Sequence, residues 1–440
     1  MAATKGGGGA FLVCYAIFVV FICIPIMMAE LALGRRTQSD PIGAFRREAG
    51  EESPWRWVGL LFFVTPFMIA VFYMVITVWI LGYFVEILLG NLTLLAEPGT
   101  FQQFINNNSV FIYLVVVAVI VNVILLKGVK EGIERTAKLL MPALFVLLLC
   151  LVGFVLTLEN ASLGVNYYLI PDLTKIDATT LNIALSQAFF SLSLGMGILI
   201  TYGSYMSREE SAQSNSKFVA GADTAVAFFA GLLILPAIFA INPDTNPSQL
   251  SDSSIGLIFT YLPGVFLELE SVVGYTGASA VAAVFFLLVF MAALTSLVSI
   301  TEVPAASLID GLGLSRKKAL VRISTCMLIL TMACVTSFGM SEWLTDFAVY
   351  ADSRKSLFDV IVDLFYDTIL PLNGLLLCLF VRTRWKRTMD DELKLGDTSY
   401  IGSYTKRYVD FSLSTFIPIV LFVIFSNTVA DKYFGISFFQ

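Results

Sequence analysis

Long apolar runs, separated by short polar connections, fill almost the whole of this sequence. Ten of them are long enough to cross a membrane, since a spanning helix needs about 20 mostly apolar residues. The runs lie near residues 11–34, 58–89, 109–126, 139–157, 180–205, 218–241, 280–308, 318–338, 357–381 and 409–429. The pattern predicts an all-α polytopic membrane protein, with residues 1–440 forming one integral domain.

The composition supports this class and narrows the chemistry. Of the 440 residues, 58% are hydrophobic and 14% are charged, whereas soluble domains are about 45–50% apolar and about 25% charged. Histidine is absent, which excludes haem ligation by His and His-based acid–base catalysis. All 6 cysteines fall inside apolar runs, so we expect them to be small packing residues of the core.

The basic residues indicate the orientation. Most of the 27 Lys and Arg residues lie in alternate connections, after the first, third, fifth, seventh and ninth runs. Cytoplasmic loops collect Lys and Arg, so these connections are predicted to face the cytoplasm and both chain ends to face outward. The stretch 256–270 is too short to span and contains Pro263, Glu268 and Glu270, and we interpret it as an external re-entrant or lid segment.

One apolar run carries an unusual group of small and polar residues. In "FFSLSLGMGILITYG", Ser191, Ser193, Gly195 and Gly197 lie close together near the middle. Glycine costs about 1 kcal/mol relative to Ala in a helix, and non-helical backbone is tolerated in a membrane only against protein or a wet cavity. Broken helices of this kind hold substrate and ions in transporters. Close packing against another helix is the alternative interpretation.

Other apolar runs supply matching polar groups. Glu30, Asp223, Thr295 and Ser296 lie inside runs, where ionisable residues are costly and usually functional. Their oxygens suit a hard cation. Three of these residues also have a purely structural interpretation. Glu30 can extend its carboxylate to the cytoplasmic surface, and the hydroxyls of Thr295 and Ser296 can bond to the preceding helical turn. Asp363 can equally be a solvated carboxylate at a helix start.

Several of these stretches resemble the neurotransmitter:sodium symporters. "GGGGAFLVCYAIFVVFICIPIMMAELALGRR" is similar to that family's second helix, and "LKGVKEGIERTAKLLMPALF" to its fourth-to-fifth connection. "SQAFFSLSLGMG" resembles its unwound sixth helix and "AALTSLVSITE" its eighth. The resemblance is closest to the bacterial branch that carries hydrophobic and aromatic amino acids. It implies the inverted-repeat, leucine-transporter-like fold, with about ten spans equivalent to family helices two to eleven, in the cell inner (plasma) membrane.

The resemblance also implies site residues. The substrate pocket would be formed by Ile69, Tyr73, Phe190, Ser191, Ser193, Leu194, Gly195, Met196, Gly197, Ser296 and Ile300. One sodium ion would bind to Ser191 and Asp223, and a second to the Ala292 carbonyl, Thr295 and Ser296. Residues with supporting roles would be Glu30, which braces the unwound backbone, Tyr15 and Gln187, which surround the family's chloride site, and Asp363, the outer gate acid. Chloride is not expected to be required, because the Asp223 carboxylate can take its place.

We therefore expect a sodium-coupled secondary transporter that imports hydrophobic or aromatic amino acids by alternating access. Its expected partners are the amino acid and the lipid bilayer, with no nucleic acid. The alternative is a non-transporting, amino-acid-binding membrane receptor or an inactive truncated remnant. An enzyme is not expected, since no nucleophile–base pair or metal cluster is evident in the sequence.

The start of the sequence differs from the family pattern. An inverted repeat needs five helices in each half, and this sequence has four runs before the broken one. The resemblance places Met1 at the exit of the family's first helix. We therefore expect that a further helix precedes Met1 in the full protein, that Met1 is an internal residue, and that the predicted sites lack the ligands which that helix supplies.

Overall fold

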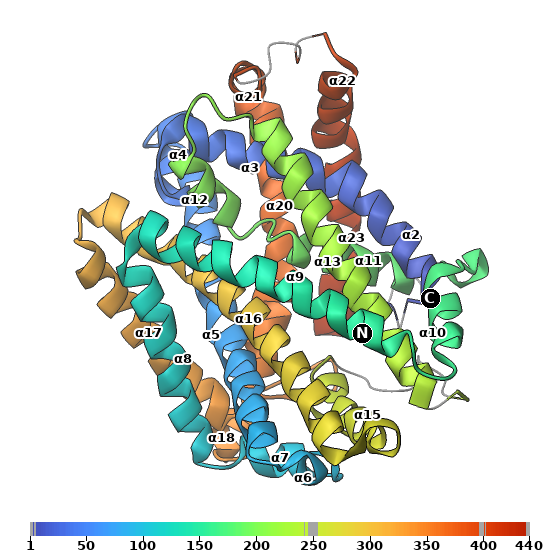
Figure 1. The fold of residues 1–440 in the computed structure, drawn as a ribbon. Coiled ribbons are helices and arrows are strands. Elements are labelled where there is room, and N and C mark those ends of the chain that lie inside the picture. Colours follow the sequence, from blue (N-terminus) through green and yellow to red (C-terminus); the bar gives the residue numbers. More distant parts are fainter. Residues whose placement is uncertain are drawn as a thin grey trace.

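The fold is a bundle of long, tilted helices joined by short connections (Figure 1). The computed structural model describes residues 3, 6–241, 243–244, 254–395, 400 and 402–436. Every candidate site residue lies within this part of the chain. Met1, which we expect to be internal, lies outside it.

Among the described residues, nine helices are long and apolar enough to cross a membrane. They are Gly9–Thr37, Trp55–Leu88, Ser109–Leu126, Val129–Val155, Ala212–Ala240, Glu270–Leu312, Arg316–Thr336, Leu357–Leu393 and Tyr404–Phe434. These helices match nine of the ten predicted runs. The tenth run, 180–205, is divided into two helices by a break at the predicted place. The prediction of a polytopic helical membrane protein is confirmed.

The first half of the chain forms the following elements: α2 (Gly9–Phe18), η1 (Val19–Cys23), α3 (Ile24–Thr37), α4 (Pro41–Ala49), α5 (Trp55–Leu88), α6 (Leu92–Ala96), α7 (Thr100–Ile105), α8 (Ser109–Leu126), η2 (Val129–Glu134), α9 (Arg135–Val155), α10 (Ala161–Leu169) and η3 (Leu173–Lys175). The π-helical turn η1 joins α2 to α3 within one span.

Asp40 begins α4 by accepting hydrogen bonds from the backbone N–H groups of Ile42 at 2.9 Å and Gly43 at 3.2 Å. These bonds satisfy donors that the start of a helix leaves without a partner.

The second half forms α11 (Ala178–Ser191), α12 (Ile198–Tyr205), α13 (Ala212–Ile241), α14 (Ser254–Gly256), η5 (Leu257–Tyr261), α15 (Leu262–Glu268), α16 (Glu270–Leu312), α17 (Arg316–Thr336), α18 (Glu342–Thr345), β1 (Ala348–Tyr350), β2 (Ser353–Lys355), α19 (Leu357–Ile361), η6 (Val362–Ile369), α20 (Leu370–Phe380), η7 (Val381–Trp385), α21 (Lys386–Leu393), α22 (Tyr404–Phe411), η8 (Ser412–Phe416) and α23 (Ile417–Phe434). The strands form one antiparallel hairpin, in which Ala348 pairs with Lys355 and Tyr350 with Ser353.

Two glycines allow a close contact between α3 and α12. A Cβ at Gly203 would lie 2.5 Å from the Leu31 carbonyl oxygen, and one at Gly34 would collide with the Ile200 carbonyl oxygen. Small residues permit such backbone approach in membranes. The other main contacts place α5 against α4, α8, α16 and α17, so α5 lies at the centre of the bundle.

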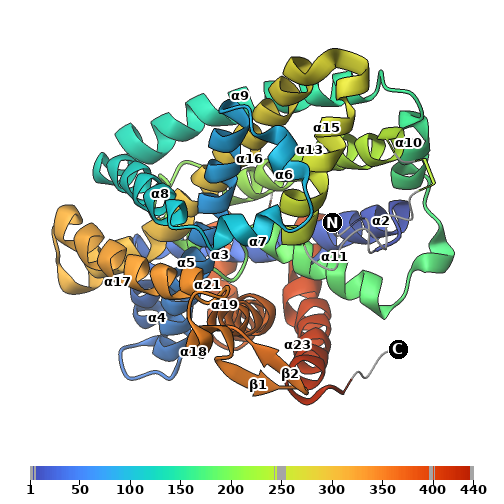
Figure 2. The same ribbon diagram turned by 90° about the horizontal axis from the view of Figure 1, so that it is seen from below.

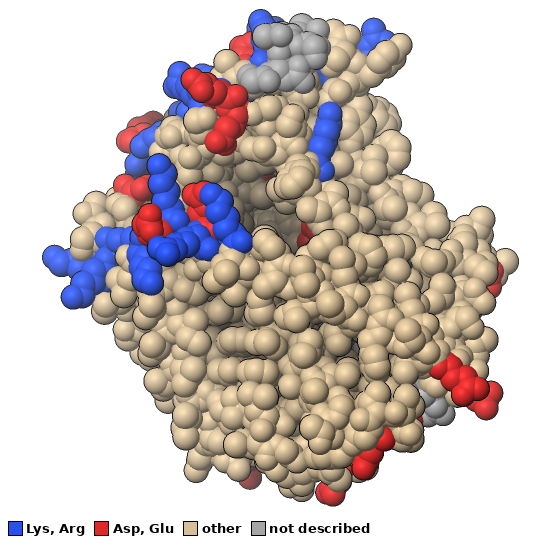
Figure 3. Space-filling model, in the orientation of Figure 1, with Lys and Arg blue, Asp and Glu red and all other residues tan. Residues whose placement is uncertain are grey.

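The surface has the distribution expected of a membrane protein. Large apolar side chains are exposed on α8, α9, α17 and α23, for example Ile112, Leu139, Ile329 and Phe422. On the face in Figure 3, Lys and Arg gather at the upper left, and a broad uncharged surface lies below them. Viewed from below, α6, α7, α15 and the β1–β2 hairpin lie toward the viewer (Figure 2). The segment 256–270 thus lies at the end away from α4 and α21, which is the end that the charge pattern predicts to be external.

The cysteine prediction holds for four residues and is wrong for two. Cys14, Cys23, Cys334 and Cys378 are buried, but Cys150 and Cys326 are exposed on the outer faces of α9 and α17. A thiol is apolar enough to lie on a lipid-facing surface, which an apolar run alone does not distinguish from the core.

Candidate substrate and ion site

The site is built around the break between α11 and α12. Helix α11 ends at Ser191, α12 begins at Ile198, and the connecting backbone turns through positive φ angles of 57° at Ser193 and 71° at both Gly195 and Gly197. A Cβ at Gly195 would lie 2.7 Å from the Leu370 carbonyl oxygen. The glycine therefore provides both the left-handed conformation and the space that the turn needs.

The peptide groups of this turn are held at both sides of Gly195. Its N–H donates to Glu30 Oε1 at 2.8 Å, and its carbonyl oxygen accepts from Asn373 Nδ2 at 2.8 Å. Asn373 Nδ2 also donates to Thr65 Oγ1 at 3.0 Å. Glu30, Thr65 and Asn373 are fully buried, so α3 and α20 hold the two peptide groups that flank Gly195, and α5 supports Asn373 through Thr65.

The resemblance implied the role of Glu30, whereas sequence reasoning missed Asn373 and Thr65. A signal for Asn373 was present, because it is the one amide in the apolar stretch "ILPLNGLLLCLF". An amide inside a membrane helix needs a partner, since the bilayer offers no water to it.

A second group of oxygens surrounds Asp223. Ser191 Oγ donates to Asp223 Oδ2 at 2.7 Å, and the Tyr15 hydroxyl donates to the same oxygen at 3.3 Å. No described Lys or Arg forms an ion pair with this carboxylate. A carboxylate within a membrane span normally has a compensating charge or a pathway role, and the oxygen-rich surroundings fit a hard cation.

One further predicted residue, Gln187, lies beside this group. Tyr15 and Gln187 line a cavity of about 300 Å³ between α2, α11 and α13, together with Thr224. The structure therefore brings Tyr15, Gln187, Ser191 and Asp223 to one region.

The residues of the second predicted sodium site are also neighbours. Thr295 Oγ1 donates to the Ala292 carbonyl oxygen at 2.9 Å and to that of Met291 at 3.2 Å. This is the bond to the preceding turn that was the structural alternative. It engages the hydroxyl proton and leaves the Oγ1 lone pairs available to a cation. The neighbouring Ser296 interacts with the Tyr73 side chain on α5.

Aromatic rings from three elements pack over the turn. The ring centroid of Phe190 lies 6.2 Å from that of Tyr73 and 4.8 Å from that of Tyr366 on η6. These are edge-on or tilted contacts within the favourable range for aromatic pairs. Tyr366 was not predicted, since a tyrosine inside an apolar run has no distinctive sequence signal.

The apolar residues of the predicted pocket belong to two hydrophobic clusters. Ile69, Met196 and Ile300 are buried in one hydrophobic cluster, and Tyr73 and Phe190 pack against it. Leu194 lies instead in the other cluster, with Phe189 and residues of α3 and α20. Met196 and Leu194 therefore contribute to different hydrophobic clusters.

At the outer end, Asp363 is bound by cationic and hydroxyl groups. Its Oδ1 accepts from Lys432 Nζ at 2.7 Å and its Oδ2 from the Tyr350 hydroxyl at 2.7 Å. Lys432 also pairs with Asp367 at 2.8 Å. Burial and the Asp363 carboxylate raise the pKa of Tyr350 above its usual range. The predicted gate acid thus joins η6 to the β1–β2 hairpin and to α23.

At the opposite end, two buried acids are paired with arginines. Arg316 donates to both carboxylate oxygens of Glu302, at 3.0 and 2.6 Å, and the Tyr205 hydroxyl donates to Glu302 Oε1 at 2.9 Å. Arg35 Nε donates to Glu392 Oε1 at 2.7 Å. Sequence reasoning predicted neither pair: Arg35 and Glu392 are 357 positions apart, and Glu302 and Arg316, 14 positions apart on consecutive helices, form no local pattern that indicates a contact.

Comparison with known proteins finds similarity to one family over almost the whole chain. The model of the "Sodium:neurotransmitter symporter family" matches residues 1–96 and 99–433. A sodium-dependent transporter of Haemophilus influenzae is 31% identical over 96% of this chain and 90% of its own length. The sodium-dependent transporter YhdH of Bacillus subtilis is 30% identical over 97% of this chain and 91% of its own length.

A solved structure shows the same fold. The crystal structure of MhsT in complex with L-phenylalanine matches with a TM-score of 0.83 and 35% identity, covering 97% of this chain and 92% of MhsT. The rat sodium-dependent neutral amino acid transporter B(0)AT3 is 29% identical over 52% of this chain and 42% of its own length.

Proposed function

Because this chain belongs to the sodium:neurotransmitter symporter family, we propose that it imports a hydrophobic or aromatic amino acid together with sodium, by alternating access. The observation that carries the proposal is the carboxylate of Asp223 beside the unwound turn, which is bonded to the hydroxyls of Ser191 and Tyr15 and has no described cationic partner. A transporter for sodium needs this kind of site, in which oxygens replace the ion's water.

One sodium ion binds at Asp223 and Ser191 in this proposal. The ion compensates the carboxylate, which would otherwise be costly in a low-dielectric interior. Because Asp223 already supplies a fixed negative charge, chloride is not required. The second ion binds at Thr295, Ser296 and the Ala292 carbonyl, on the face of α16.

The amino acid binds between the turn and α5. Its side chain lies against Ile69, Met196 and Ile300, under the ring of Phe190, and its carboxylate accepts from the Tyr73 hydroxyl. This assignment is supported by the buried apolar cluster and by the aromatic contacts of Phe190. L-Phenylalanine in the MhsT structure and the neutral amino acids named for B(0)AT3 belong to the same substrate class.

Coupling follows if sodium and substrate favour the same conformation. The Gly195 peptide is bonded to α3 on one side and to α20 on the other. Closure around the substrate and ion therefore requires the turn, α3 and α20 to keep their positions relative to one another. The Glu302–Arg316 ion pair connects helices at one end of the bundle, and the Asp363–Lys432 ion pair connects helices at the other. In alternating access, one end opens at a time.

A binding experiment tests the proposal. Purified protein is titrated with sodium in the presence of radiolabelled L-phenylalanine, for the parent chain and for Asp223→Asn, Thr295→Val and the control Ser324→Ala. Ser324 donates to Asn122 Oδ1 between α17 and α8 at 2.7 Å, so the control loses a membrane hydroxyl outside the site. Thr295→Val should raise the sodium concentration at half-saturation about tenfold, the effect of losing one polar contact.

Competition then defines the substrate. Leucine, phenylalanine and tryptophan should displace the label more effectively than glycine, aspartate or lysine. Binding that is independent of sodium, or stronger competition by a charged amino acid, would contradict the proposal.

A further inference from the structure

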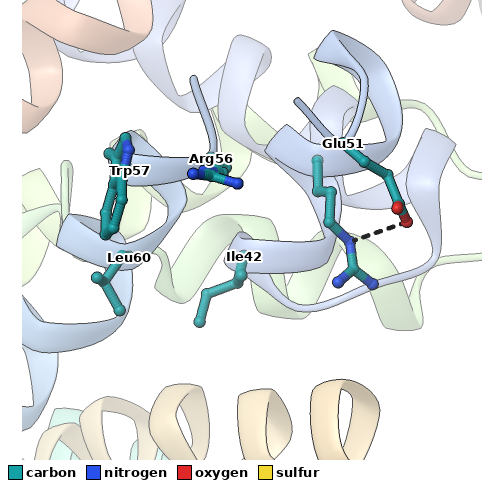
Figure 4. Close-up of a pocket in the computed structure, with 6 residues that line it drawn as sticks. Ile42, Glu51, Arg56, Trp57 and Leu60 are labelled. Carbon is teal, nitrogen blue, oxygen red and sulfur yellow. Dashed lines mark ion pairs between the residues drawn. The ribbon is translucent and has the colours of Figure 1, made fainter. Parts of the chain in front are cut away.

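A surface hollow of about 350 Å³ lies where α5 enters the membrane. It is lined by Ile42 and Arg46 of α4, Glu51 of the connection, and Arg56, Trp57 and Leu60 of α5 (Figure 4). None of these residues takes part in the proposed substrate or ion site. The volume is in the range of small-ligand pockets, about 300–1,000 Å³.

The hollow has one polar and one apolar side. Trp57 and Leu60 stand together on one side, and Arg56 lies between them and Glu51 (Figure 4). Trp57 is 58% exposed and Leu60 is 37% exposed. Tryptophan in the first turn of a spanning helix lies typically at the level of the lipid headgroups.

Neither guanidinium group is held by a strong ion pair. Arg46 and Glu51 are 3.9 Å apart and have side chains that are 48% and 84% exposed, so their pairing is weak. Arg56 lies over the Trp57 ring, 5.1 Å from its centroid, and forms no ion pair with a described carboxylate. The planar fork of arginine matches the oxygens of a phosphate group.

The position of the hollow indicates the source of the anion. It lies at the end of the bundle where the basic connections gather, which the positive-inside rule assigns to the cytoplasm. The cytoplasmic leaflet contains anionic lipids, which attract basic groups near the surface. A soluble anion would make no use of the exposed Trp57 and Leu60, whereas a lipid has a phosphate next to an apolar chain.

We propose that this hollow binds the headgroup of an anionic phospholipid. The phosphate lies between Arg46 and Arg56, and the glycerol and first chain carbons lie against Trp57 and Leu60. The site is independent of the proposed transport function, because it shares no residue with the substrate or ion sites.

Native mass spectrometry of the purified full chain tests this with phosphatidylglycerol and phosphatidylcholine as probes. The double variant Arg46→Gln/Arg56→Gln is compared with Arg135→Gln/Arg322→Gln, which removes the same charge from exposed positions at the same end of the bundle. The first pair should lower the affinity for phosphatidylglycerol at least about tenfold. The control pair should change it less than about twofold, and phosphatidylcholine should bind weakly to all.

Two further measurements distinguish a bound lipid from a free phosphate. Trp57→Ala should weaken phosphatidylglycerol binding several-fold, and soluble glycerol 3-phosphate should compete poorly. The proposal is overturned if both double variants lose affinity equally, if phosphatidylcholine binds as well as phosphatidylglycerol, or if glycerol 3-phosphate binds as tightly as the lipid. If the first double variant does not fold, the Trp57→Ala and glycerol 3-phosphate results decide.

Discussion

At the scale of single residues, the Gly195 peptide is where the site and the rest of the bundle meet. A free peptide group in the membrane interior would be costly, since no water can satisfy it. Glu30 accepts from its N–H and Asn373 donates to its carbonyl oxygen. The break in the helix is stable because buried side chains replace the lost helical hydrogen bonds.

Replacement of Asn373 should therefore impair binding at the turn. Asn373→Leu removes the donor to Gly195 and to Thr65 and leaves two buried acceptors unsatisfied, at about 1–3 kcal/mol for such a group. We expect substrate affinity to fall about tenfold or more, measured by equilibrium binding of labelled L-phenylalanine. Asn122→Leu is the control, since Asn122 bonds to Ala118 and Ser324 on the outer helices. Equal loss of affinity in both variants would contradict the role of Asn373.

Residues of the site differ in how visible they are in the sequence. Glu30, Ser191, Asp223 and Gly195 were found because charges, hydroxyls and glycines are conspicuous in apolar runs. Tyr366 was missed because its ring adds nothing unusual to its run. Asn373 becomes a hydrogen-bond partner of the turn only when α20 packs against it in the folded protein. No local sequence pattern predicts that contact.

At the scale of elements, the main feature is the division of one span into α11 and α12. The positions with positive φ lie at Ser193, Gly195 and Gly197, the small residues that indicated a break. Sequence reasoning found nine continuous spans and this broken one. It did not find the β1–β2 hairpin or the surface helices α4 and α21, because they are short and their stability comes from tertiary contacts.

Gly195→Ala tests whether the break needs glycine. The new Cβ would lie 2.7 Å from the Leu370 carbonyl oxygen. The alanine would also have to adopt φ near 71°, a left-handed conformation that is unfavourable for an L-residue. We expect sodium-dependent substrate binding to be lost. Gly153→Ala on α9, where no atom lies within 4 Å of the added Cβ, should bind normally. Normal binding by Gly195→Ala would show that the turn is shaped differently.

At the scale of the whole molecule, clusters of ionic and hydroxyl contacts join several elements at each end of the bundle. The outer contacts connect η6, α23 and the hairpin through Asp363, Asp367 and Lys432. The inner contacts connect α12, α16 and α17 through Tyr205, Glu302 and Arg316. The family fold was predictable from the order of motifs, but these long-range pairs were not.

Lys432→Met should destabilise the outer end. It leaves the carboxylate of Asp363, a residue only 5% exposed, without its closest cationic partner and with Lys355 alone at 3.7 Å, and a buried charge that loses its partner is destabilising. Thermal unfolding in detergent should begin several degrees lower than in the parent. Arg354→Gln, which breaks the exposed pair with Asp346 at 2.7 Å, should change it little. A smaller shift for Lys432→Met than for Arg354→Gln would contradict the importance of the outer cluster.

The most direct test of sodium-coupled import is uptake into proteoliposomes that contain the purified chain. An inward sodium gradient should drive accumulation of labelled L-phenylalanine above its outside concentration, and replacement of sodium by potassium or addition of a sodium ionophore should abolish it. Omission of chloride should leave accumulation unchanged. Sodium-dependent binding without accumulation would contradict the proposal and favour a receptor or an inactive remnant.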